Sequence, residues 1–136
     1  MSGETKLARL LATMSPELSA QSFVFYTTKA MSWPDIGRLQ PKSYFQEKEG
    51  VSLIVEHSIA DLNNLHYEGV YRCITLNVHS SLEAVGLTAA VSDALTQHNI
   101  SANVVAAYFH DHIFVNNKDA KTALEVLTAL SNTNQM

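Results

Sequence analysis

Imidazole and carboxylate side chains follow one another at His110, Asp111 and His112. Both groups are ligands of zinc and iron, and alternate residues of an extended strand share a face. Two or three donors do not complete the coordination of an ion unless a distant residue joins them. His57 and His79 could join them, so a small metal-dependent enzyme stays open as an alternative, but we predict no metal or other cofactor.

Hydroxyl and carboxylate groups also gather at Ser80, Ser81 and Glu83. A nucleophilic serine needs a base within hydrogen-bond reach, and no Gly-x-Ser-x-Gly turn surrounds either serine. Such residues are typical of a helix start, where they satisfy free N–H groups. Cys73 lies within a predicted strand with Arg72 on the opposite face, so we expect an inert thiol. We therefore predict that the protein is not an enzyme.

The composition excludes several classes of partner. The five glycines, at positions 3, 37, 50, 69 and 86, are spread too far apart for a phosphate-binding loop. The net charge is −4 and the nine Lys and Arg residues are scattered, so we expect no nucleic-acid partner. The start of the chain is unlike a signal peptide, and no apolar run approaches the roughly 20 residues that span a bilayer. We expect a soluble cytoplasmic protein without membrane contact.

Hydrophobic residues make up 46% of the 136 residues, enough for a packed core. Apolar periodicity predicts helices over 7–14, in a short stretch after Ser58, over 87–98 and over 120–130. Ser58 and Asp61 resemble a capping box at the second of these. Strands are predicted at 22–28, 51–57, 70–79, 100–109 and 112–115, with a hairpin turn near His110-Asp111. The stretch 29–50 has looser patterning.

Apolar segments of the two halves match at fixed offsets. At an offset of 80, Leu7 aligns with Leu87 and Val24 with Val104; at an offset of 60, Leu53-Ile54-Val55 aligns with Ile113-Phe114-Val115. This predicts an internal duplication whose first copy has an insertion at about 29–50. The order αββα-β-αββα indicates an α+β, ferredoxin-like fold, an antiparallel sheet with helices on one face.

The segment His79 to Leu127 resembles an ACT domain, particularly the C-terminal regulatory ACT domains of aspartokinases. A strand there leads through Val85-Gly86-Leu87 into a helix, and Asn99-Ile100 opens the next strand. The whole chain is similar to short bacterial stand-alone ACT proteins of unknown function. The likeness rests on Ser2 to Thr5, Val78 to Val91 and Ile100 to Val115.

This resemblance implies two ACT-like modules, 1–68 and 69–136, and binding of an amino acid or similar effector where modules meet. The residues carried over are Ser80, Ser81, Glu83, Val85, Gly86, Leu87, Asn103 and Val104. Gly86 would let backbone approach a ligand, the helix N-terminus would receive a carboxylate, and Asn103 would bind a zwitterion. The first half has no matching glycine loop, because the strand before its first helix would precede Met1. We therefore expect one full site per chain.

We expect a small-molecule-binding regulatory protein and, because a small sheet leaves an edge to be covered, a homodimer. The alternative is a structural module without a ligand that docks on a partner enzyme or transporter. Trp33, Tyr44 and Phe45 could cover a ligand, form a dimer contact or pack on the sheet.

Overall fold

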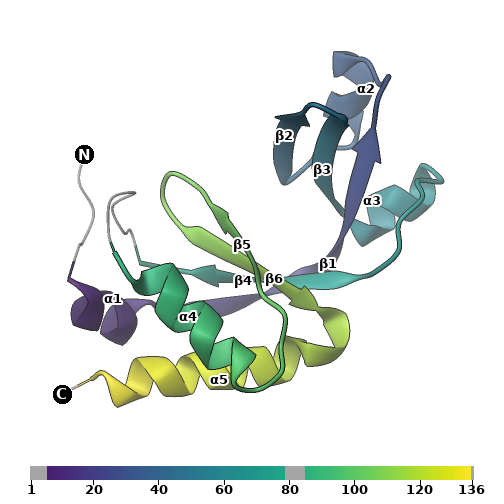
Figure 1. The fold of residues 1–136 in the computed structure, drawn as a ribbon. Coiled ribbons are helices and arrows are strands. Elements are labelled where there is room, and N and C mark those ends of the chain that lie inside the picture. The colour runs from purple at the N-terminus through teal and green to yellow at the C-terminus, as the bar shows by residue number, and fades with distance from the viewer. Residues whose placement is uncertain (1–5, 79–84, 136) are drawn as a thin grey trace. The chain divides into compact units, whose positions relative to one another are not determined.

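The computed structural model describes residues 6–78 and 85–135 (Figure 1). The elements in chain order are α1 (Leu7–Thr13), β1 (Pro16–Thr28), α2 (Trp33–Arg38), β2 (Ser43–Glu47), β3 (Gly50–Glu56), α3 (His57–Leu62), β4 (Tyr71–Leu76), α4 (Leu87–Thr96), β5 (Asn103–Ala106), β6 (Asp111–Asn116), the 3₁₀ turn η1 (Asn117–Asp119) and α5 (Ala120–Thr133). After α1, the order of strand, helix, hairpin and helix occurs twice. The α+β, ferredoxin-like class is confirmed.

The chain forms two compact units. Unit 2 runs from Ala20 to Tyr71, and unit 1 comprises the chain on either side of it. In unit 1 the strands follow the order β1-β4-β6-β5, with only the first residues of β1 taking part, and in unit 2 the order is β2-β3-β1. Among residues 6–78 and 85–135, no helix is both long enough and apolar enough to span a membrane.

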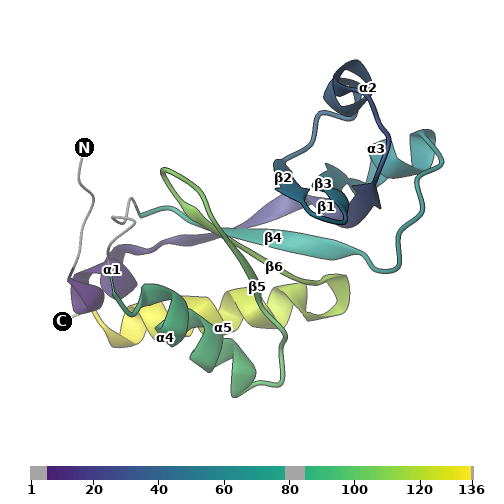
Figure 2. The same cartoon turned by 45° about the horizontal axis from the view of Figure 1, so that its top comes forward.

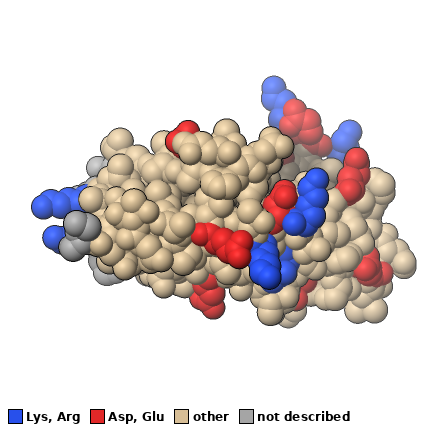
Figure 3. Space-filling model, turned by 90° about the horizontal axis from the view of Figure 1, so that it is seen from below, with Lys and Arg blue, Asp and Glu red and all other residues tan. Residues whose placement is uncertain are grey.

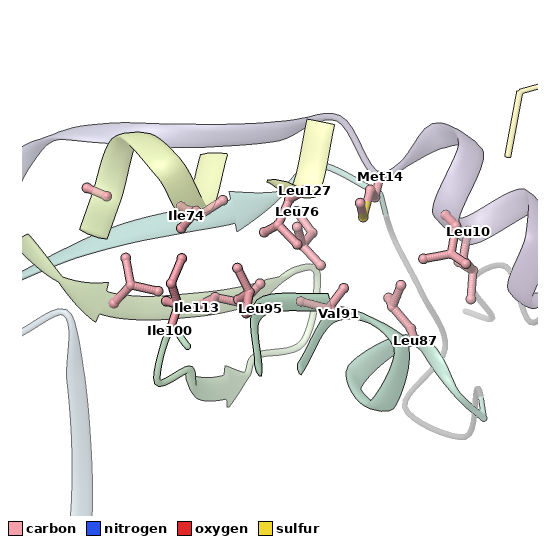
Figure 4. Packing of buried hydrophobic residues seen from close by; sticks show 14 residues of the cluster. Leu10, Met14, Ile74, Leu76, Leu87, Val91, Leu95, Ile100, Ile113 and Leu127 are labelled. Carbon is pink, nitrogen blue, oxygen red and sulfur yellow. The ribbon is translucent and has the colours of Figure 1, made fainter. Parts of the chain in front are cut away.

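One face of the sheet in unit 1 is covered by helices. Ile74 and Leu76 of β4 alternate along their strand, as Ile113 and Val115 do in β6, and all four side chains are buried in one cluster. Leu87, Val91 and Leu95 form the facing stripe of α4, in agreement with the predicted helical period (Figure 4). Helices α4 and α5 lie side by side in both views (Figures 1 and 2).

Unit 2 has its own smaller core. Its buried residues come from β1, α2, β3 and α3 and the turn after α2: Val24, Ile36, Leu39, Leu53, Val55 and Ala60. Strand β3 pairs antiparallel with β1, where Val24 faces Val55, and with β2, where Tyr44 faces Leu53. Side chains of β3 therefore pack against those of the short helices α2 and α3.

The two hairpins have the same register at an offset of 60. Tyr44 faces Leu53 in the first hairpin, and Val104 faces Ile113 in the second. The structural counterpart of Val104 is therefore Tyr44, and the alignment of Val24 with Val104 at an offset of 80 is wrong.

The stretch 29–50 is accordingly no insertion in the order of elements. It contains α2 and β2, which stand where the second copy has α4 and β5. Sequence patterning missed both, because α2 spans only six residues and buries Ile36 alone, while β2 has no buried residue. Short and mostly exposed elements carry little apolar periodicity.

Candidate functional site

Gly86 occupies the turn that opens α4. Its φ of +102° lies in the left-handed region, which side chains disfavour. A Cβ at this position would also lie 3.1 Å from Cδ2 of Leu7 in α1, so the space beside Gly86 is filled by a side chain of the protein itself. The glycine is required for the turn and for the packing of α1, in addition to any contact with a ligand.

The first turn of α4 has backbone N–H groups without an intrahelical acceptor. Among the described residues, the first helical bond runs from Ala90 N to Gly86 O at 2.8 Å. The N–H groups of Leu87, Thr88 and Ala89 precede this bond, and N–H groups in the first turn of a helix have no acceptor within the helix itself. Gly86 has no side chain to accept from them. Such a helix start attracts an anion, because the N–H groups and the helix dipole both favour negative charge.

The predicted ligand-binding residues around Gly86 do not share one environment. Ser80, Ser81 and Glu83 lie outside the described residues. Val85 is 83% exposed beside Gly86, whereas the side chain of Leu87 is buried in the core of unit 1. What Leu87 can offer a ligand is therefore its backbone N–H group.

Asn103 and Val104 lie beyond the other end of α4. Asn103 opens β5, and its Nδ2 donates to the carbonyl of Phe114 at 3.2 Å. Val104 packs against the core. Helix α4 is about 15 Å long. In Figure 4 the side chains of Leu87, Val91, Leu95 and Ile100 form a row, with Leu87 at one end and Ile100, which follows the helix, at the other. Within one chain, Asn103 and the N-terminus of α4 are therefore not brought together.

The counterpart of α4 in unit 2 begins differently. β1 precedes α2, so the expectation that the first half lacks a strand before its helix is wrong. Helix α2 begins after Ser32, whose Oγ accepts the N–H of Asp35 at 3.3 Å. The first copy thus caps its own helix with a side chain, whereas the cap residue of α4 is Gly86, which has no side chain to do so.

The two histidines near the tip of the second hairpin differ in their contacts. Nδ1 of His112 lies 2.9 Å from Oγ1 of Thr75 and 4.0 Å from Sγ of Cys73. The sequence did not predict this imidazole beside the cysteine. Nδ1 of His110 is buried without a hydrogen-bond partner in the described part of the chain, and its ring centre lies 6.4 Å from that of His112. Within residues 6–78 and 85–135, no three His, Cys, Asp or Glu residues are grouped to hold a metal ion.

Unit 2 contains a chain of polar side chains that the sequence did not indicate. Oγ of Ser22 lies 3.4 Å from Nδ1 of His57, and Nε2 of His57 lies 2.7 Å from the hydroxyl of Tyr67. That hydroxyl donates to Oδ1 of Asp61 at 2.6 Å. The predicted capping box is wrong: α3 begins at His57, its cap residue Glu56 makes no side-chain cap bond, and Asp61 binds Tyr67 instead.

Two aromatic side chains of unit 2, Trp33 and Phe45, lie at the surface. Trp33 stacks on Tyr44 with ring centres 5.1 Å apart, and both Trp33 and Phe45 remain 68% exposed, so neither is buried against the sheet.

On the face in Figure 3, most Lys and Arg side chains lie beside Asp and Glu, and the described residues there form no continuous basic surface.

Comparison with known proteins places these features in a family. An ACT-domain model matches residues 2–72, and a second ACT-domain model matches residues 68–129. The chain belongs to the ACT-domain family. ACT domains are regulatory modules, and the strand–helix–hairpin–helix order of each copy agrees with their fold. No curated protein matched in the corresponding search.

Among solved structures, the chain is similar to a Vibrio cholerae protein of unknown function described as a possible transport protein. They share 45% identity over 92% of this chain and 95% of that one, with a TM-score of 0.83. An Agrobacterium tumefaciens protein is 14% identical over 82% and 84% of the two chains, with a TM-score of 0.65. The regulatory subunit of aspartate kinase from Thermus thermophilus is 8% identical over 88% and 97%, with a TM-score of 0.62. The last two likenesses concern the fold alone.

Replacing Gly86 with alanine tests the turn before α4. We expect Gly86→Ala to lower the free energy of unfolding by about 1–3 kcal/mol, because the new Cβ meets Leu7 and the left-handed backbone becomes strained. Gly37→Ala is the matched control, since an added Cβ there meets nothing within 4 Å and α2 gains a better helix former. Urea unfolding measures both. Equal effects of the two substitutions on the free energy of unfolding would contradict the role of Gly86 in the turn before α4.

The alkaline stability of the protein tests the contact of Tyr67. Donation to the Asp61 carboxylate, burial and the charge of Asp61 raise the pKa of Tyr67 above its ordinary value. The stabilisation is therefore complete below the unfolded pKa of about 10 and is lost as the pH rises through the folded pKa. We expect Tyr67→Phe to lose less stability than wild type on raising the pH from about 9 to 11.

Thermal unfolding across this range measures the difference. Tyr44→Phe is the control, because the Tyr44 hydroxyl donates to the neutral Gln46 amide at 2.8 Å rather than to a carboxylate. Tyr44→Phe should follow the wild-type curve. A Tyr67→Phe curve parallel to wild type would refute the contact with Asp61.

Proposed function

We propose that this protein binds an amino acid or a similar small carboxylate at the N-terminus of α4 and regulates a partner through that binding. The observation that carries the proposal is the start of α4 at Gly86, which has no side chain to cap the first turn, in a segment matched by the ACT-domain model. The backbone N–H groups of Leu87, Thr88 and Ala89 would receive the carboxylate. Val85 and the loop residues Ser80, Ser81 and Glu83 would surround it.

Asn103 enters this proposal from a second copy of the chain. Within one chain it lies beyond the far end of α4, and β5 is the last strand in the order β1-β4-β6-β5. An exposed strand edge favours pairing with another chain. A homodimer that places β5 of one copy beside the α4 entry of the other would let Asn103 bind the amino or carboxylate group of the ligand. Ser32 already caps α2, which favours one such site per chain.

We also propose how the whole chain acts. The chain acts without catalysis and without a resident cofactor, in the cytoplasm, with modules that divide near residue 68. Ligand binding at the contact between copies would favour one arrangement of the dimer over another, and the partner would respond to that arrangement.

A charge placed in the first turn of α4 tests the site. A thermal-shift screen of the twenty amino acids should identify a ligand, since a ligand at 100 times its Kd adds about 2.7 kcal/mol. Thr88→Glu should abolish that shift, because its carboxylate opposes the ligand carboxylate, while the helix dipole keeps the variant folded. Thr88 is exposed, so the substitution disturbs no packing.

Thr122→Glu is the matched control, since Thr122 is also exposed and lies in the first turn of α5. It should retain the full shift. A screen without any shift, or equal shifts in the two variants, would contradict the proposal.

A further inference from the structure

Unit 2 contains a pocket that is separate from the α4 entry. It has a volume of about 240 Å³ and lies between residues 25–27 of β1 and residues 66–71, which lead into β4. At about 30 Å³ for each water molecule in the liquid, the volume corresponds to about eight waters, so a small organic molecule fits. All residues of its lining belong to unit 2.

Aromatic rings form much of the wall. Phe25 and Tyr71 meet edge to face, with ring centres 5.0 Å apart and planes at 74°, and Tyr26 and Tyr67 complete the aromatic part of the lining. Gly69 leaves room for this arrangement, because a Cβ there would lie 3.2 Å from Cε1 of Tyr71. The Tyr71 ring therefore packs closely on Gly69, where an added side chain would displace it by a few tenths of an ångström.

Tyr67 is held in position by the polar chain described above. Its hydroxyl lies 2.7 Å from Nε2 of His57 and donates to Oδ1 of Asp61 at 2.6 Å. Two hydrogen-bond partners on one hydroxyl restrict the rotation of the ring. Binding to such a wall loses less side-chain entropy than binding to a mobile one.

The lining contains one carboxylate and one imidazole, those of Glu68 and His66. Glu68 is the charged carboxylate among the lining residues, and the lining contains no Lys or Arg. The faces of aromatic rings attract cations through their quadrupole, and a nearby carboxylate adds to that attraction. An anion would find no Lys, no Arg and no helix N-terminus among these residues.

We propose that this pocket is a second binding site, which takes a compact organic cation with an ammonium group. The ammonium group lies against the rings of Phe25, Tyr67 and Tyr71, with the Glu68 carboxylate at the rim. This site is independent of the proposed amino-acid site at α4, because its lining contains no residue of unit 1.

Choline and its neutral isostere 3,3-dimethylbutan-1-ol distinguish a cation site from a merely apolar pocket. Titration of the full chain, followed by calorimetry and by amide chemical shifts, should show saturable binding of choline with shifts at residues 66–71. The isostere should bind at least about tenfold more weakly, because it has the shape but not the charge. No saturable choline binding, or equal affinity for the two compounds, would overturn the proposal.

Two matched charge variants locate the site. Glu68→Gln should weaken choline binding several-fold, whereas Glu49→Gln, which removes the same charge from an exposed turn outside the pocket, should leave it unchanged. Both residues are exposed, so both variants should fold as wild type does. Equal affinities of the two variants, or shifts that lie away from residues 66–71, would refute this location.

Discussion

Ile74, Leu76, Ile113 and Val115 turn to one face of the sheet in unit 1, where α1, α4 and α5 cover them. Each strand alternates its side chains, so this burial sets the register of β4 and β6. It also sets the direction of α4, whose stripe from Leu87 to Leu95 must lie on that face. The position of the helix start, and so of the proposed anion site, follows from the packing of these side chains.

Those constraints explain which parts of the fold the sequence could predict. The strand β6 and helices α4 and α5 carry strong apolar periodicity and were predicted nearly to their ends. The offset of 60 is confirmed for β3 and β6, and it holds for β2 and β5 as well. The alignment of α1 with α4 at an offset of 80 is misleading, because two amphipathic helices have similar apolar periodicity whatever their place in the topology.

The site was less accessible to sequence reasoning. Gly86 was singled out for its backbone freedom, and its φ of +102° agrees, but the contact with Leu7 joins residues 79 positions apart. The chain from Ser22 through His57 and Tyr67 to Asp61 has no motif, because it depends on β1, α3 and the following loop meeting in space. The pocket beside Tyr67 was missed for the same reason.

The central claim is that α4 of one copy and Asn103 of another form one ligand site, and mixing two variants tests it most directly. Thr88→Glu and Asn103→Ala should each abolish binding of the amino acid found by the screen. After joint refolding in equal amounts, half of the dimers are mixed and each has one intact site. Calorimetry should then give about one quarter of the wild-type number of sites. A mixture that binds no ligand, or an Asn103→Ala protein that binds as wild type does, would contradict the account.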